Sequence, residues 1–128
     1  MKKVPYMPKL EKIVGLFERS YKKFPYGFCV EATRVVHLLM GLEEVGGTKP
    51  DHIPFHACNY DPKLGVYVDI TASQYSYSTD KILIFKPQFR IFYQTEEHTK
   101  KQKEYDSPEM RNAVNRILRL AKRDPLFR

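Results

Sequence analysis

The sequence predicts an α+β fold in which two helices precede an antiparallel β-sheet and one helix follows it. Apolar residues recur at three- and four-residue spacing near both ends of the chain, whereas two central segments alternate apolar and polar residues. The 128 residues suffice for a single domain with one core. A composition of 42% hydrophobic and 13% aromatic residues is that of a globular protein and not of a disordered one.

The cysteine count and the apolar runs predict the cellular setting. Two cysteines are too few for a disulfide framework, and by themselves they cannot form a zinc finger. No apolar run has the length of a signal peptide or the roughly 20 residues of a membrane span. We therefore expect a cytoplasmic protein that contacts no membrane and uses no cofactor.

The net charge of +7 is concentrated at the two ends of the chain. Residues 1–23 hold seven basic and two acidic side chains, and residues 100–128 hold nine basic and four acidic ones, so each end carries +5. Residues 24–99 hold six basic and nine acidic side chains, or −3. Basic ends can attract an acidic protein or nucleic acid, although such residues more commonly form a solvated helix face.

The first helix is predicted over residues 8–23. Pro8 suits a first helical turn, and apolar side chains recur on one face. These side chains are Leu10, Ile13, Val14, Phe17, Tyr21 and Phe24. Pro25 and Gly27 should end this element in a tight connection.

The second helix should begin near Phe28 or Cys29 and run to about Glu44. It is apolar over much of its girth, so we expect it to be largely buried. Gly46 and Gly47 should end it. A cysteine would thus stand at the head of a buried helix.

Two segments with alternating apolar residues predict a β-hairpin. The first strand covers residues 53–60 and the second covers residues 65–71. Alternation assigns one face of each strand to the core, namely Phe55 and Ala57 in the first and Val66, Val68 and Ile70 in the second.

The loop between these strands sets the predicted register. If residues 61–64 form a four-residue loop, Tyr60 pairs with Gly65 and His56 falls opposite Asp69. Directly opposed residues have Cβ atoms roughly 5 Å apart, close enough for a carboxylate to hold an imidazole.

Two further strands and a helix complete the prediction. Residues 81–86 form a third strand, and the continuous apolar run from Ile82 to Phe85 favours a central position. Residues 90–95 form a fourth strand. Ser107 and Pro108 begin the last helix with a capping hydroxyl and a proline in the first turn. Its apolar stripe consists of Met110, Val114, Ile117, Leu118 and Ala121.

Cys29, His56 and Asp69 have the chemistry of a catalytic triad. A thiol is nucleophilic as thiolate, which a helix N-terminus and a nearby imidazolium both favour. His56 would act as base, and Asp69 would fix its tautomer. The Cys29 N–H is one candidate oxyanion donor, and Tyr26 and Asn59 are candidates for the second.

Each of these residues also has a structural interpretation. A cysteine in an apolar helix often belongs to the core, a strand histidine can be a satisfied surface residue, and Asp69 could cap a strand end. His52, His56 and Cys58 could instead contribute to a zinc site, although no fourth ligand is evident. Cys58 could also approach Cys29 and form a regulatory disulfide.

Three short motifs resemble the core of the transglutaminase-like cysteine proteases, within the papain-like superfamily. In order, they are Gly27-x-Cys29-x-x-x-Thr33, His56-Ala57 and Tyr67-x-Asp69-x-Thr71. The resemblance implies a papain-like fold and a Cys29–His56–Asp69 triad. Arylamine acetyltransferases share the same Cys-His-Asp order, so the resemblance implies a superfamily more than one activity.

The chain departs from that family at the residues around the triad. Cys58 stands where a tryptophan usually follows His-Ala, and Phe28 and Val30 flank the cysteine where transglutaminases place Gln and Trp. We therefore expect hydrolysis or transfer at a peptide or protein amide, or at a thioester, and not protein crosslinking. The alternative is a non-catalytic binding module that uses its basic ends to hold an acidic protein or nucleic acid.

Overall fold

The computed structural model describes residues 4–47, 56–74, 79–86 and 106–128. The elements in these ranges are α1 (Met7–Ser20), α2 (Cys29–Met40), β1 (Glu43–Gly47), β2 (His56–Asp61), β3 (Val66–Asp69), η1 (Ala72–Gln74), β4 (Leu83–Phe85), α4 (Pro108–Lys122) and η3 (Pro125–Phe127). The four strands form one antiparallel sheet in the order β1-β2-β3-β4. The predicted α+β class is therefore confirmed.

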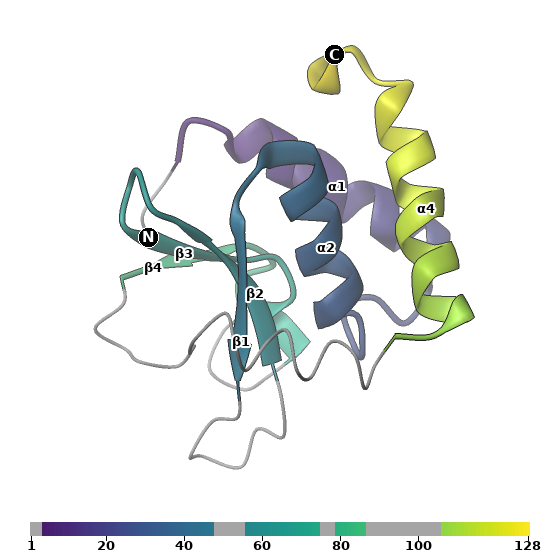
Figure 1. The fold of residues 1–128 in the computed structure, drawn as a ribbon, viewed down its shortest axis with the longest axis horizontal. Helices are drawn as coiled ribbons and strands as arrows, with labels where there is room; N and C mark the ends of the chain where they lie inside the picture. Colours follow the sequence, from purple (N-terminus) through teal and green to yellow (C-terminus); the bar gives the residue numbers. More distant parts are fainter. Residues whose placement is uncertain (1–3, 48–55, 75–78, 87–105) are drawn as a thin grey trace.

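Helix α2 lies between the sheet and the other helices (Figure 1). It contacts β1 and β2 on one side and α4 on the other, and α1 packs against α4. The main core lies where these layers meet and is made of apolar side chains from α1, α2, β3 and α4, among them Leu10, Ile13, Phe17, Val36, Val68 and Ile117. None of the described helices is long and apolar enough to cross a membrane.

Helix α1 ends at Ser20 and not at residue 23 as predicted. Tyr21 is already extended, with φ −138° and ψ 115°. The chain then folds back so that the Phe24 ring stacks on Phe17 with centroids 4.8 Å apart. In a continuous helix these two residues would be about 10.5 Å apart along the axis, so aromatic packing replaces the last predicted turn.

Helix α2 begins at Cys29, as predicted, but ends at Met40. Gly41 adopts the left-handed conformation, with φ +75°, and its N–H bonds to the His37 carbonyl. The segment after it is strand β1, which the sequence analysis did not predict, so the predicted helix end at Gly46-Gly47 is wrong. The Arg34 Nε to Glu44 Oε1 ion pair of 3.1 Å ties α2 to β1.

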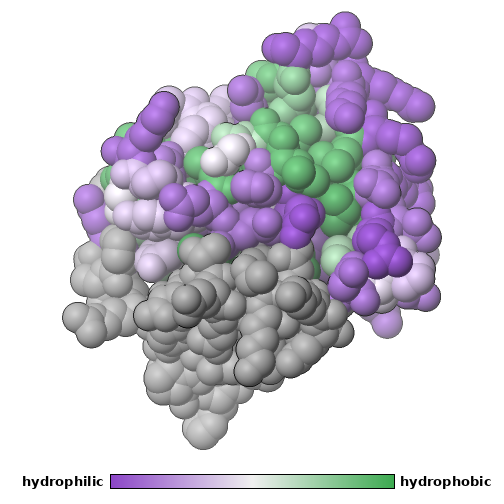
Figure 2. Space-filling view, in the orientation of Figure 1, coloured by the Kyte–Doolittle hydropathy of each residue, from purple (hydrophilic) through white to green (hydrophobic). Residues whose placement is uncertain are grey.

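Helix α2 is largely buried, as predicted, although part of one face reaches the surface. Figure 2 shows hydrophobic residues gathered over α2 and beside α4, bordered by hydrophilic ones. Leu38 is 52% exposed, whereas Val35 and Val36 are fully buried. The buried apolar residues of α2 pack against the sheet and against α4.

The β2–β3 hairpin forms, but its register differs by two residues from the prediction. Tyr60 pairs with Tyr67 instead of Gly65, because the turn begins after Asp61 and includes Gly65. The Asp61 carboxylate accepts hydrogen bonds from the N–H groups of Lys63 and Leu64. Gly65, at φ +64°, closes the turn in a conformation that disfavours residues with a side chain.

The shift by two residues keeps the predicted faces of both strands. Of the expected core residues, Ala57, Val66, Val68 and Ile70 are buried, while Phe55 lies outside the described residues. His56 and Asp69 are no longer directly opposite, but they remain on one face as diagonal neighbours.

Strand β4 lies at the end of the strand order, so the predicted central position is wrong for the sheet described. The strand is apolar because both of its faces are covered. Ile84 packs in the main core on one face, and Phe85 packs with Val45 and Cys58 on the other. The predicted strand over residues 90–95 lies outside the described part of the chain.

Helix α4 begins as predicted. The Ser107 Oγ accepts a hydrogen bond of 3.1 Å from the Met110 N–H, and Pro108 occupies the first helical position. Its buried residues are Met110, Ala113, Val114, Ile117 and Ala121, and Leu118 is partly buried. Beyond its end, Asp124 forms a 2.9 Å ion pair with Lys12 of α1.

Candidate active site

Cys29 is the first residue of α2, and the aromatic side chain before it holds it in place. The Phe28 ring lies 5.0 Å from Tyr21 and 5.8 Å from Phe24, between ring centroids. Phe28 is the N-cap residue, and its side chain forms no capping hydrogen bond. The N–H groups at a helix start, such as that of Cys29, are donors that can bind a negatively charged group.

A cavity of about 450 Å³ opens beside Cys29. Its wall combines apolar and polar side chains, including Tyr21, Val30, Glu31, Gln74, Glu109 and Met110. Burial raises the pKa of Glu31. Cys29 is 9% exposed, so it forms part of the wall without projecting into solvent.

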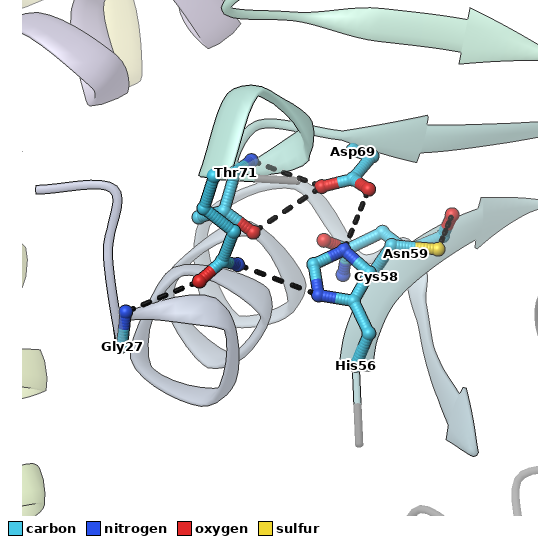
Figure 3. A network of polar contacts seen from close by, with 7 residues as sticks. Gly27, His56, Cys58, Asn59, Asp69 and Thr71 are labelled. Carbon is cyan, nitrogen blue, oxygen red and sulfur yellow. Dashed lines mark hydrogen bonds and ion pairs between the residues drawn. The ribbon is translucent and has the colours of Figure 1, made fainter. Parts of the chain in front are cut away.

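His56 and Asp69 form a buried pair at the sheet end nearest Cys29. The His56 Nε2 lies 2.7 Å from the Asp69 Oδ2, and each residue is 1% exposed. The other carboxylate oxygen, Oδ1, accepts hydrogen bonds from the Thr71 N–H at 2.9 Å and from its hydroxyl at 3.3 Å. Figure 3 shows Asp69 held in this way between Thr71 and the imidazole.

Cys29 meets His56 across the junction of α2 and β2. Cys29, Val30 and Ala57 form one buried cluster, and Ala57 directly follows His56. The Cys29 side chain lies close enough to the imidazole to raise the pKa of His56. Asp69 contacts Nε2, and the amide nitrogen of Gln74 lies 3.4 Å from Nδ1. The structure thus brings together all three predicted triad residues.

The pair keeps the imidazole charged. Burial by itself lowers the pKa of His56, but the Asp69 carboxylate and, after it, Cys29 outweigh burial and raise the pKa to about 10. An imidazolium therefore stands beside Cys29 throughout the neutral pH range.

This charge state predicts how stability depends on pH. The folded protein holds the His56 proton up to about pH 10, whereas an unfolded histidine loses it near pH 6.5. The stabilisation is therefore complete below pH 6.5 and is lost as the pH rises towards 10, by at most about 1.4 kcal/mol per pH unit. Urea unfolding between pH 6 and 9 measures this slope. His56→Gln should flatten it, and a stability that increased over this interval would contradict the charged pair.

Cys58 lies away from the cavity and is chemically unlike Cys29. It packs with Val45 and Phe85 and is 2% exposed. Burial, and then the nearby Asp69 and Cys29 side chains, raise the pKa of Cys58 well above its ordinary value, so it stays a thiol. Both cysteines are free, without the disulfide that the sequence allowed.

The two residues considered for the second oxyanion donor do not line the cavity. Asn59 is 2% exposed and its amide donates to the Thr33 carbonyl at 3.0 Å, which ties β2 to α2. Tyr26 is 63% exposed. The zinc hypothesis included His52, which lies outside the described residues, and those described contain no group of three ligands that could hold a metal.

Gln74 is the residue at this site that the sequence analysis did not identify. It ends the η1 turn after Asp69 and Thr71 and lines the cavity together with Cys29. The sequence does show a glutamine three residues after the Asp-x-Thr motif. The direction of its side chain, however, depends on the 3₁₀ turn η1, which the sequence did not predict.

Comparisons of the chain with protein-family models, curated proteins and solved structures found no match.

Proposed function

We propose that this protein is a small cysteine-dependent hydrolase or acyltransferase with a papain-like, transglutaminase-like core. Its substrate would be a peptide or protein amide, or a thioester, and peptide or amide hydrolysis is the leading activity. The buried 2.7 Å pair of His56 and Asp69 beside a cysteine at a helix N-terminus carries this proposal. A cavity next to the thiol supplies room for a substrate.

The reaction would begin with attack of the Cys29 thiolate on a carbonyl carbon. An S–C bond forms, and the electron pair of the carbonyl moves to its oxygen, which the Cys29 N–H at the helix end stabilises. The carbonyl then re-forms as the C–N or C–S bond to the leaving group breaks, and the His56 imidazolium gives this group its proton.

The second half of the reaction releases the acyl group from Cys29. Water or an amine attacks the thioester, and neutral His56 accepts its proton through Nδ1. The S–C bond breaks, the acyl product leaves, and the thiolate–imidazolium pair is restored. Asp69 stays ionised throughout and keeps the ring oriented through Nε2.

Alkylation rates test this assignment directly. Iodoacetamide should label Cys29 at least roughly tenfold faster than Cys58, because only the first cysteine has an imidazolium partner and a cavity beside it. His56→Ala should slow the labelling of Cys29 and leave that of Cys58 unchanged. The measurement is mass spectrometry of peptides from a time course. Equal, slow labelling of the two thiols would refute the nucleophile assignment.

One observation favours the alternative of a binding module. Helix α4 carries several exposed basic side chains, among them Arg111, Arg116, Arg119 and Lys122. They form a surface to which an acidic protein or nucleic acid could bind with an affinity that falls as salt increases. The thiol has no role in such binding, so a Cys29→Ala variant separates the two functions.

A further inference from the structure

We infer that the side-chain amide of Gln74 is the second oxyanion donor of this site, acting with the Cys29 N–H on the substrate carbonyl. The inference rests on the proposed function, and it assigns a role in that reaction to a residue outside the triad. Three observations support it: Gly27 fixes the orientation of the amide, the amide faces the same cavity as Cys29, and its NH₂ group lies beside His56.

The orientation of the Gln74 amide is set by the backbone before Cys29. The Gly27 N–H donates to the Gln74 Oε1 at 3.1 Å, so the amide oxygen faces the Gly27–Cys29 connection. The NH₂ group must then point the opposite way, and its nitrogen lies 3.4 Å from the His56 Nδ1. Figure 3 shows the two contacts as a bridge from Gly27 to His56.

The segment that leads from β3 into the η1 turn carries both Gln74 and Asp69, the partner of the other ring nitrogen. Asp69 ends β3 and holds Nε2, Thr71 bonds to Asp69, and the Gln74 N–H bonds to the Thr71 carbonyl at 3.1 Å. One short segment therefore places a carboxylate on one side of the imidazole and an amide donor on the other. Gln74 faces the same cavity as Cys29.

The protonation state of His56 decides what the amide does. When His56 is neutral with its proton on Nε2, Nδ1 can accept a hydrogen bond from Gln74. When His56 is an imidazolium, Nδ1 carries a proton and cannot accept one. The NH₂ group is then released beside Cys29, in the same state in which the thiolate attacks. A carbonyl oxygen that gains charge in the cavity is the acceptor then available to it.

Both donors act on the same oxygen during acylation. As the Cys29 sulfur bonds to the carbonyl carbon, the π pair moves to oxygen, and that oxygen accepts hydrogen bonds from the Cys29 N–H and the Gln74 amide. Neither donor gives up its proton. The pair returns to the carbonyl when the leaving group departs with the proton of His56.

Two reactions of the same thiol separate an oxyanion donor from a residue that only positions His56. Acylation by p-nitrophenyl acetate passes through an oxyanion, whereas alkylation by iodoacetamide displaces iodide from a CH₂ carbon and forms none. Gln74→Ala should reduce the acylation rate roughly 10²-fold and leave the alkylation rate of Cys29 within about twofold. Gln74→Glu keeps an acceptor for Gly27 but loses the donor, so it should acylate as slowly or more slowly.

Ser73→Ala, on the same turn, is the matched control and should change neither rate by more than about twofold. Slow labelling of Cys58 reports in each variant that the protein is folded, and Gln74→Glu provides the test if Gln74→Ala does not fold. Equal loss of acylation and alkylation would make Gln74 a positioning residue and overturn the inference, as would no loss of either. Wild-type protein that is alkylated rapidly at Cys29 but never acylated would instead refute the proposed function, and the inference with it.

Discussion

Cys29→Ala should abolish acyl turnover, with a loss of roughly 10⁴-fold or more, whereas Cys58→Ala should leave turnover within about threefold. The thiol of Cys29 is the only described sulfur beside both the imidazole and the cavity. Cys58 is a buried thiol that contacts Val45 and Phe85 and does not line the cavity. The two variants remove the same chemical group from the two positions, so they differ only in the role of the thiol.

The measurement is the release of p-nitrophenolate from p-nitrophenyl acetate, followed by thioester and peptide substrates. Circular dichroism should show both variants folded, because each substitution removes a single sulfur atom from a buried side chain. Turnover by Cys29→Ala at the wild-type rate would exclude a thioester intermediate. If that variant also kept salt-sensitive binding of an acidic partner, the binding module would be the better account.

Asp69→Asn should reduce turnover by roughly 10²- to 10⁴-fold without unfolding the protein. The asparagine oxygen can still accept from the Thr71 N–H, so the turn after β3 is retained. Its NH₂ group, however, would face the His56 Nε2 and force that nitrogen to accept a hydrogen bond. The neutral ring would then carry its proton on Nδ1, towards Cys29, and could not remove a proton there.

Asp61→Asn is the control for this substitution. Asp61 is also a buried aspartate, 5% exposed, and it accepts a 2.6 Å hydrogen bond from the Tyr6 hydroxyl far from the thiol. Its replacement should lower stability modestly and leave turnover within a few-fold. The Asp69→Asn variant should also lose rapid alkylation of Cys29 at neutral pH, because the imidazolium loses the carboxylate that raises its pKa. Unchanged turnover and alkylation in Asp69→Asn would remove Asp69 from the site.

Strand periodicity accounts for why the His56–Asp69 contact was predictable although its register was not. Side chains alternate faces with a period of two, so the two-residue shift between the predicted and the observed pairing returns each residue to the same face. The error came from the turn. The carboxylate of Asp61 bonds to two turn N–H groups and keeps its own residue in the strand, while Gly65 belongs to the turn.

Local sequence patterns predicted the helix that begins at Cys29 and the hairpin that carries His56 and Asp69. They did not predict the contacts that hold the helix and the hairpin together. A cysteine following Gly27 at the start of an apolar segment sufficed to predict a helix beginning at Cys29. The end of α2 was predicted wrongly because Gly41, Gly46 and Gly47 can each end a helix. In the structure Gly41 ends it, and Gly46 and Gly47 belong to β1, which pairs with β2. The bond between the Asn59 amide and the Thr33 carbonyl, which holds helix and sheet together, links residues 26 positions apart and leaves no local pattern.

The α+β class, the cysteine at a helix start and the shared face of His56 and Asp69 could be predicted from the sequence, because each follows from a short-range periodicity or a capping preference. Three other features could be found in the folded structure alone. The Cys29 thiol lies close to the His56 ring, Cys58 packs with Val45 and Phe85 away from the cavity, and Gln74 bridges Gly27 and His56. These contacts depend on how α2 packs against the sheet and on how one 3₁₀ turn directs an amide. Such directions are set by long-range packing, which no local pattern of residues encodes.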